Sequence, residues 1–130
     1  MVTGENMNER KACPIDKTLD YIGKKWTLII IRDLFLGKRK FNEFLEANKQ
    51  LSNKVLSQKL KELESHDLIE KRIISKTPLL AEYYLTDKGI ALNKVLFEIA
   101  MYGVTILKDE IQSTSCTPDA VAYLKKELKI

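Results

Sequence analysis

Residues 51–65 read LSNKVLSQKLKELES, and the prediction of the fold starts from the pattern in this segment. Its apolar residues recur at intervals of three and four, so in a helix they form one stripe that packs against a core. The apolar residues are Leu51, Val55, Leu56, Leu60 and Leu63. The outer face carries Asn53, Lys54, Ser57, Gln58 and Lys61. We therefore predict an amphipathic helix over residues 51–65 whose outer face is rich in hydrogen-bond donors.

A shorter helix is predicted just before this one, and a hairpin just after it. Phe41, Phe44 and Leu45 share one face of the shorter helix, and a tight polar connection follows. Two short helices joined in this way form a helix-turn-helix pattern.

After the second helix, the spacing of the apolar residues changes from that of a helix to that of strands. Residues 68–74 and 82–86 are predicted to be short strands, and residues 75–78 the tip between them. A helix-turn-helix followed directly by a hairpin is the winged variant of the motif.

The segment before the helix-turn-helix predicts two further helices. Pro14 stands at the favoured first-turn position of a helix whose apolar face includes Ile15 and Leu19, and Gly23 ends it. Residues 24–36 are apolar on almost every side, which is typical of a helix buried at the centre of a domain.

A long helix is predicted after the hairpin, capped by Thr86 and Asp87 and running to about residue 112. One apolar stripe consists of Leu92, Val95, Leu96, Ile99, Tyr102 and Ile106. The other consists of Ile90, Phe97, Met101, Val104 and Ile111. Such a helix is about 38 Å long, more than a domain of this size covers on both faces. We therefore expect one stripe to pack on the domain and the other on a second subunit.

A linker at residues 113–115 leads to a last predicted helix. Thr117, Pro118 and Asp119 are typical of a helix start. The apolar face of this helix consists of Val121, Leu124 and Leu128.

These patterns predict a mainly α fold with a small β-hairpin. The architecture is a winged helix-turn-helix domain with added N- and C-terminal dimerisation helices. We expect a flexible tail at residues 1–12, the domain with its long helix at 13–112, and the linker with a C-terminal amphipathic helix at 113–130.

The positive charge of the chain is local. The net charge is +4, and residues 38–76 hold ten basic and six acidic side chains, while the rest of the chain holds twelve of each. A local basic excess favours an anionic partner, most often nucleic acid or an anionic membrane surface. A solvated charged face is the alternative.

Length and composition indicate one soluble domain. The chain has 130 residues, of which 45% are hydrophobic and 31% charged. The longest strongly apolar run, residues 26–31, is far shorter than the roughly 18 residues of a membrane span. Residues 1–11 lack the apolar core of a secretory signal. We therefore expect a cytoplasmic protein.

Catalytic and metal-binding patterns are not found in the sequence. The two cysteines, Cys13 and Cys116, and the single histidine, His66, have no metal-ligand spacing. There is no glycine-rich phosphate loop and no nucleophile elbow. We expect no enzymatic activity, no cofactor and no metal.

Several blocks, in order and with compatible spacing, resemble the HxlR family of winged helix-turn-helix transcriptional regulators, relatives of the MarR group. The resemblance covers about residues 13–103. The blocks are CPI (13–15), LDYIGKKWT (19–27), GKRKFNEF (37–44), LSNKVLSQKLKELE (51–64), EYYLT (82–86) and DKG (87–89).

The chain departs from the family pattern at two places. Asp67 stands just past the second helix, where members usually have a glycine, and a left-handed turn there costs Asp more than Gly. Residues 79–81 are apolar where family wings often carry a basic residue, which puts wing contacts to DNA in doubt.

The resemblance implies a homodimer that binds double-stranded DNA at an inverted-repeat operator, with the helix at 51–65 in the major groove and the wing at 68–86. Amides such as Asn53 and Gln58 pair with adenine edges, and Lys54 and Lys61 reach guanine or phosphate. Ser52 offers its hydroxyl, or the helix start its N–H groups, to a phosphate. Ser57 is included in the DNA-binding set.

Four further cations are interpreted as phosphate contacts, which position a protein without reading sequence. They are Arg39, Lys40, Lys71 and Lys76. For Arg39 and Lys40 a plain surface charge is an equal alternative.

The last two predictions of this kind concern the dimer interface and an alternative function. The expected dimer interface consists of Ile15, Leu19, Leu96, Ile99 and Tyr102. A winged-helix module used for protein–protein association without specific DNA binding is the alternative function.

Cys13 is the candidate sensor. It precedes Pro14 at a helix start, and neighbouring cations such as Lys17 favour the thiolate. The resemblance points the same way, because some members of the family sense oxidants or electrophiles through a cysteine at this position. Cys116 is a possible resolving partner, and an inert small apolar residue is the alternative for Cys13.

Overall fold

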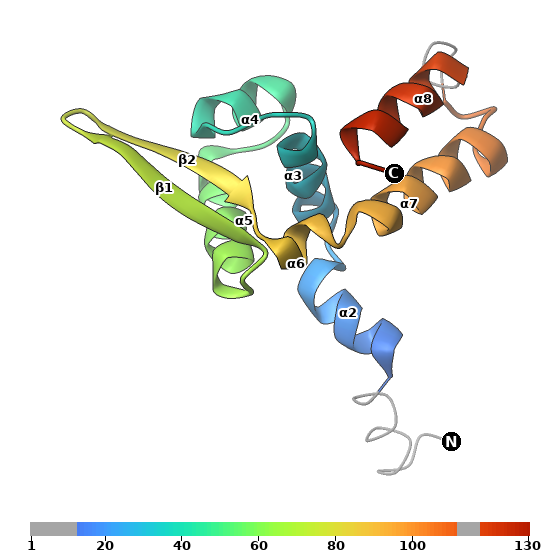
Figure 1. Cartoon of the computed structure of the whole chain (residues 1–130), viewed down its shortest axis with the longest axis horizontal. Coiled ribbons are helices and arrows are strands. Elements are labelled where there is room, and N and C mark those ends of the chain that lie inside the picture. The colour runs from blue at the N-terminus through green and yellow to red at the C-terminus, as the bar shows by residue number, and fades with distance from the viewer. Residues whose placement is uncertain (1–12, 112–117) are drawn as a thin grey trace.

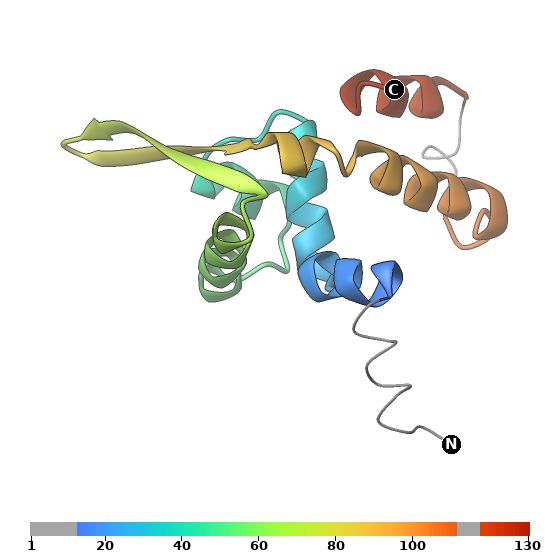
Figure 2. The ribbon, with the colours of Figure 1, turned by 60° about the horizontal axis from the view of Figure 1, so that its bottom comes forward.

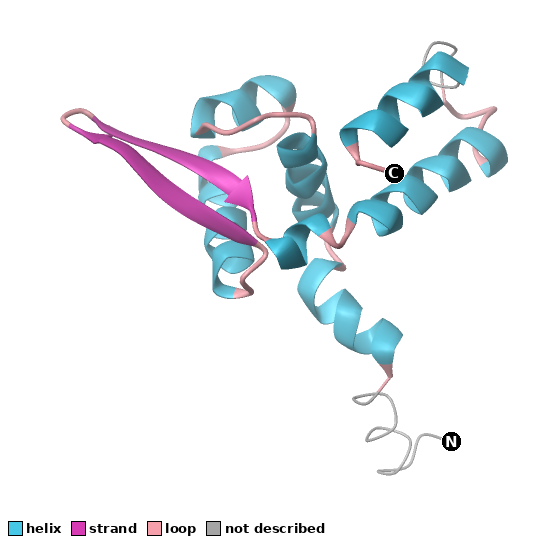
Figure 3. Cartoon of the chain, viewed as in Figure 1, coloured by secondary structure: helices cyan, strands magenta, loops and turns pink. Residues whose placement is uncertain are grey.

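The structure is mainly helical, and a two-stranded antiparallel hairpin projects from the helices (Figures 1 and 3). The computed structural model describes residues 13–111 and 118–130. The elements are α2 (Pro14–Ile22), α3 (Lys25–Phe35), α4 (Phe41–Ala47), α5 (Asn53–Ser65), β1 (Ile69–Lys76), β2 (Leu79–Leu85), α6 (Asp87–Ile90), α7 (Asn93–Ile106) and α8 (Pro118–Glu127). The predicted mainly α fold with a small hairpin is confirmed.

The core is built around α3, as its nearly all-round apolar pattern predicts. Ile30 and Ile31 are fully buried, and Phe44 of α4 and Leu56 of α5 pack into the same cluster. Burial of this apolar surface is the main stabilising contribution to the fold. Because α5 buries its apolar stripe here, its polar face is turned outward.

Helix α5 is shorter at its start than predicted, and both its ends are capped. Ser52 is the N-cap, and its Oγ accepts a hydrogen bond from Val55 N at 3.1 Å. At the other end Leu68 N donates to Leu63 O and Asp67 N donates to Glu64 O, which is the Schellman pattern.

Asp67 occupies the left-handed position of that pattern, with φ 59°. A residue with a Cβ is disfavoured there, although aspartate tolerates the conformation better than most residues. The strain expected from the missing glycine is therefore present.

The hairpin is longer than the predicted one. Register pairs run from Ile69 with Leu85 to Lys76 with Leu79, with a bulge between Ile73 and Ser75. The expected tip at residues 75–78 is wrong, because cross-strand pairing continues through Ser75 and Lys76 and leaves only Thr77 and Pro78 in the turn.

The single long helix predicted after the hairpin is also wrong. Thr86 does cap a helix, because its Oγ1 accepts a hydrogen bond from Gly89 N, but α6 ends at Ile90 and α7 begins at Asn93. Between them Leu92 N bonds three residues back, to Gly89 O. The Asn93 side chain adds local competition, since its Oδ1 accepts from Lys94 N.

The position of α6 depends on Gly89. A Cβ at this residue would lie 2.2 Å from Leu68 O, so the close approach of α6 to the start of the hairpin requires a glycine. Helix α7 ends at Ile106 and not near residue 112, so it is about 21 Å long.

The stretch Asp87–Ile106 corrects one expectation from the sequence. Its length and mean hydropathy of 1.3 would suit a membrane span, although it contains no long uninterrupted apolar run. Only 11% of its most apolar window is buried within the chain. The mean hydropathy of the whole stretch detects this apolar surface, whereas a search of the sequence for unbroken apolar runs does not.

Helix α8 folds back alongside α7 (Figure 2). Asn93 Nδ2 donates a hydrogen bond to Leu128 O at 2.9 Å, and the Leu128 side chain is buried. A C-terminal helix with a docked apolar face is therefore present, as predicted.

Candidate nucleic-acid interface

The outer face of α5 presents several polar side chains to solvent. Asn53, Lys54, Gln58 and Lys61 are exposed, and Ser57 is half-buried. Gln58 Nε2 lies 3.4 Å from Glu62 Oε1, a distance typical of a weak hydrogen bond. These side chains have the donors and acceptors that read base edges in a major groove.

The start of α5 offers a second kind of contact. The Ser52 hydroxyl is exposed, and it accepts the cap hydrogen bond while keeping its own hydrogen free to donate. The N-terminal amides of a helix and its dipole together favour an anion such as phosphate.

Lys59 was not among the predicted site residues, and it does not belong to the outer face. Its side chain is buried, and its Nζ lies 3.3 Å from Glu62 Oε2. Helical spacing places it beside the apolar stripe, where the stem of a lysine packs and its amine reaches a carboxylate.

Arg39 makes several contacts within the protein, and its role as a phosphate contact stays a prediction. One Nη donates to Leu34 O at 2.9 Å and to Lys38 O at 2.8 Å. The guanidinium lies over the Tyr84 ring at 4.8 Å, and Arg39 O accepts from Tyr83 N. Arg39 therefore joins the end of α3 to β2.

Lys40 and Lys71 are exposed and lie on opposite sides of a groove between α4 and the hairpin. The groove holds about 330 Å³. At its α4 side, Glu43 accepts hydrogen bonds from Arg39 N and Lys40 N, each at 2.9 Å, and these bonds lower the pKa of Glu43. The groove thus combines two free amines with a backbone held in place by a carboxylate.

The hairpin carries fewer free cations than its sequence indicates. Arg72 lies 3.9 Å from the centre of the Tyr84 ring and is paired with Glu70. Lys76 is exposed beside the turn. The far end of the hairpin also exposes apolar side chains, namely Ile73, Ile74, Leu79 and Leu80.

A buried polar network behind the interface escaped the sequence reasoning. Asp33 of α3 is 2% exposed, and it accepts hydrogen bonds from Arg32 Nε, Arg32 Nη2 and Asn48 Nδ2. Arg32 Nη2 also lies 3.2 Å from Asn48 Oδ1. The network ties α3 to the connection between α4 and α5. A lone acid within an apolar helix was the only available signal.

An apolar face runs across α2 and α7. Ile15, Leu19, Ile99 and Tyr102 each have half or more of their side chain exposed. Leu96, by contrast, is 9% exposed and belongs to the core, because it points between α7 and α3. Its expected place in a dimer interface is therefore corrected.

Cys13 is half-buried and is the N-cap residue of α2. Its carbonyl oxygen accepts a hydrogen bond from Lys17 N at 3.0 Å. Cys116, proposed as its partner, lies outside the described residues. Within residues 13–111 and 118–130, no cluster of side chains suited to holding a metal ion is found.

His66 forms the C-cap of α5 and lies against Tyr21 of α2, with ring centres 4.4 Å apart. This contact joins the end of α5 to α2, the helix that carries part of the apolar face.

Sequence comparison places residues 21–111 in the family described as HxlR-like helix-turn-helix. The chain is 40% identical over 97 residues to YvaP of Bacillus subtilis, an uncharacterised HTH-type transcriptional regulator, covering 74% of this chain and 90% of that protein. It is 36% identical over 88 residues to the HTH-type transcriptional regulator YodB of the same organism, covering 67% and 79%.

Solved structures agree in fold. The reduced form of YodB from B. subtilis superposes with a TM-score of 0.61 and 35% identity, covering 70% of this chain and 90% of that one. The redox regulator HypR in its oxidised form gives 0.67 and 28% identity, covering 78% and 100%. The winged helix-turn-helix architecture is thereby confirmed.

Proposed function

Because the chain belongs to the HxlR-like helix-turn-helix family of transcriptional regulators, we propose that it is a homodimer that binds a specific inverted repeat in double-stranded DNA. The regulator itself is not an enzyme. The observation that carries the proposal is the solvent-facing row of donors on α5, together with the exposed lysines of the groove between α4 and the hairpin.

Helix α5 enters the major groove. Asn53 and Gln58 present amides that pair bidentately with adenine, and Lys54 and Lys61 reach guanine or phosphate. Ser57, half-buried on the same helix, completes the proposed set of DNA-contacting residues.

Phosphate contacts position the protein. Lys40 and Lys71 face one groove and lie on the two elements that flank α5, while Lys76 extends the row along the hairpin. The exposed start of α5 at Ser52 adds a site for one further phosphate. The local charge excess of residues 38–76 supports this arrangement.

Dimerisation occurs through the apolar face on α2 and α7, which two copies bury against each other. Helix α5 packs on α3, which follows α2 directly, so a dimer through α2 holds the two α5 helices at a set spacing. We expect about 34 Å, one turn of DNA, and hence an inverted repeat.

The same apolar face suits two alternatives, membrane attachment and association with a different protein. In a cytoplasmic dimer the second copy covers the apolar face, so no bilayer is needed to cover it. The excess of positive charge lies on the helix-turn-helix rather than on α7. Both points favour DNA binding by a soluble dimer.

We also propose that oxidation of Cys13 lowers DNA affinity. Relatives include the redox regulator HypR, and Cys13 caps α2, the helix that contributes to the proposed interface. A disulfide or adduct there shifts the subunits, and a shift of a few ångströms disturbs the one-turn spacing. Operator binding by wild type and Cys13→Ser, before and after diamide, tests this; equal affinities in all four samples reject it.

The main proposal is tested by selecting duplexes from a random library and measuring affinity against salt. Lys54→Ala should lower affinity and, if its contact is to phosphate, reduce the salt slope by about one. Lys126→Ala, an exposed cation of α8, is the matched control and should change neither. Failure to enrich any sequence, or binding that is independent of salt, rejects the proposal.

A further inference from the structure

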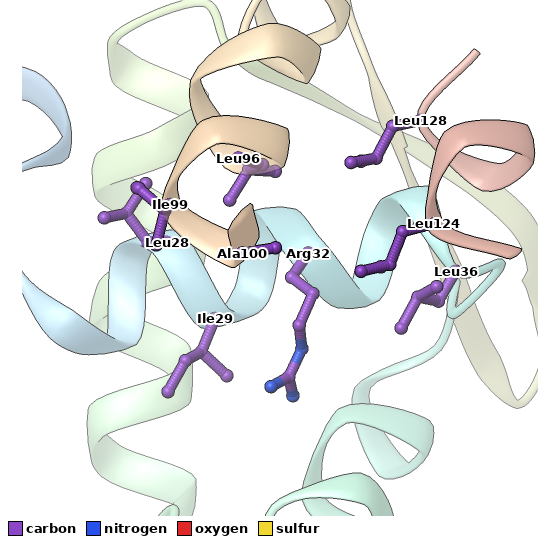
Figure 4. A pocket seen from close by; sticks show the side chains of 9 residues that line it. All are labelled: Leu28, Ile29, Arg32, Leu36, Leu96, Ile99, Ala100, Leu124 and Leu128. Carbon is purple, nitrogen blue, oxygen red and sulfur yellow. The ribbon is translucent and has the colours of Figure 1, made fainter. Parts of the chain in front are cut away.

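An apolar cavity of about 270 Å³ lies between α3, α7 and α8 (Figure 4). Leu28 comes from α3, Leu96 and Ala100 come from α7, Leu124 comes from α8, and Leu128 directly follows α8. Its volume is slightly below the roughly 300–1,000 Å³ of pockets for drug-sized ligands. A compact ligand of about ten non-hydrogen atoms suits this size.

Helix α8 forms one wall of this cavity and lies beyond the residues that match the family model. The family match ends at residue 111, whereas α8 begins at Pro118. The helix is held by the Asn93–Leu128 hydrogen bond and by burial of Leu128, which is 3% exposed. Without it, the wall formed by Leu124 and Leu128 would be missing.

Arg32 is the charged residue that lines the cavity. Figure 4 shows its side chain extending from α3 between Ile29 and Leu36, with the guanidinium at the edge of the apolar cluster. Its Nε and Nη2 are bonded to Asp33 and Asn48, but Nη1 makes no hydrogen bond to any residue that the structure describes. The side chain is 44% exposed, so its guanidinium remains accessible to a ligand at the edge of the cavity.

We propose that this cavity binds a small amphiphilic carboxylate, with its apolar body between α3, α7 and α8 and its carboxylate on Arg32. An enclosed apolar wall favours an alkyl or aromatic group. A guanidinium whose Nη1 is unused, at the edge of the apolar cluster, selects an anionic head through charge-assisted hydrogen bonds. A neutral ligand of the same length lacks these charge-assisted hydrogen bonds to Arg32 and should bind more weakly.

The site connects directly to the helix-turn-helix. Arg32 is shared between the cavity and the Asp33–Asn48 network, and Asn48 begins the connection to α5. A ligand carboxylate on Nη1 shares with Asp33 the guanidinium that holds this network together. Provided that α5 reads DNA as proposed above, ligand binding and operator binding should therefore change each other's affinity by the same factor.

The experiment is calorimetric titration of the full chain with octanoate and, separately, with 1-octanol. We expect octanoate to bind with a Kd of about 100 μM and to bind at least about tenfold more tightly than octanol. Arg32→Gln should remove this preference and leave octanol binding unchanged. Ala100→Phe should fill the cavity and abolish both, and Tyr123→Ser on the exposed side of α8 should alter neither.

Absence of octanoate binding at millimolar concentration overturns the site, as does equal binding of the two probes. Dissociation of a dimer by octanoate also overturns it, because the cavity would then belong to the subunit interface. Direct binding is measured without DNA, so a chain that binds octanoate but no operator supports the site and rejects the proposed function. The opposite result rejects only the site.

Discussion

Asn48 Nδ2 donates a hydrogen bond of 2.7 Å to Oδ2 of Asp33, across fifteen residues of chain and into a site where the carboxylate is 2% exposed. Asn48 Nδ2 also donates a hydrogen bond to Phe44 O in the middle of α4. One side-chain amide thus joins the central helix to the turn that precedes α5. A buried carboxylate needs such partners, because desolvation of an unpaired charge is costly.

Removing one partner of this network should strongly destabilise the fold. We expect Asn48→Ala to lower the free energy of unfolding by about 3 kcal/mol, because it leaves the carboxylate of Asp33 under-satisfied. Urea denaturation measures the loss. Glu46→Ala, at an exposed acid on α4, should change stability by less than about 0.5 kcal/mol. Equal midpoints for the two variants would contradict the role of the network.

Asp67→Gly should stabilise the protein by about 0.5–1 kcal/mol, because glycine adopts the left-handed conformation at φ 59° without the Cβ penalty. The substitution also removes the ion pair with Lys88, but that pair spans 3.7 Å between exposed groups and contributes little. Asp67→Ala should instead destabilise the protein, since alanine has a Cβ and lacks aspartate's tolerance of the left-handed conformation. Thermal unfolding of the three proteins gives the order, and a glycine variant less stable than wild type would refute it.

Arg39 and Lys40 are adjacent, and their substitutions should have different effects. Arg39→Ala removes two hydrogen bonds and the stacking on Tyr84, so it should lower stability by about 1–3 kcal/mol. Lys40→Ala should leave stability nearly unchanged and weaken DNA binding, with a smaller salt slope. Chemical denaturation and DNA titration of both variants separate the roles. The assignment fails if both variants lose stability equally.

Glu43 should contribute to the pH dependence of stability. Its folded-state pKa is lowered from 4.5, chiefly by hydrogen bonds from Arg39 N and Lys40 N. A lowered folded-state pKa means that the contribution is present above pH 4.5 and is lost as pH falls through the folded-state value. The stability difference between wild type and Glu43→Gln should therefore shrink below pH 4.5. A difference that stays constant down to pH 3 in urea titrations would exclude this carboxylate as the cause.

Leu19→Glu should prevent dimerisation, because it places a charge in the apolar face on α2, where Leu19 is 53% exposed in the protomer. Leu79→Glu is the matched control, since Leu79 is 66% exposed on the hairpin, away from that face. Sedimentation at micromolar concentration should find a monomer for the first variant and a dimer for the second. A dimeric Leu19→Glu would place the interface elsewhere.

The sequence by itself determined the local elements and the family to which they belong. The three- and four-residue spacing in residues 51–65 predicts α5 and its polar face, because helical geometry alone puts those side chains on one side. The nearly all-round apolar pattern of residues 24–36 predicts a central helix for the same reason. Asp67, standing where the family has glycine, predicts the left-handed turn that the structure contains.

Only the tertiary structure decided which distant groups meet. Arg39 looks like a surface cation in the sequence, and its contacts with Leu34 and Tyr84 exist because β2 returns beside the end of α3. Asp33 is the buried centre of a hydrogen-bond network because the fold brings the Asn48 side chain against it. The cavity under α8 exists because Leu128 docks against α7. Periodicity assigns a residue to a face of its own helix, but the partner of that face depends on the path of the whole chain.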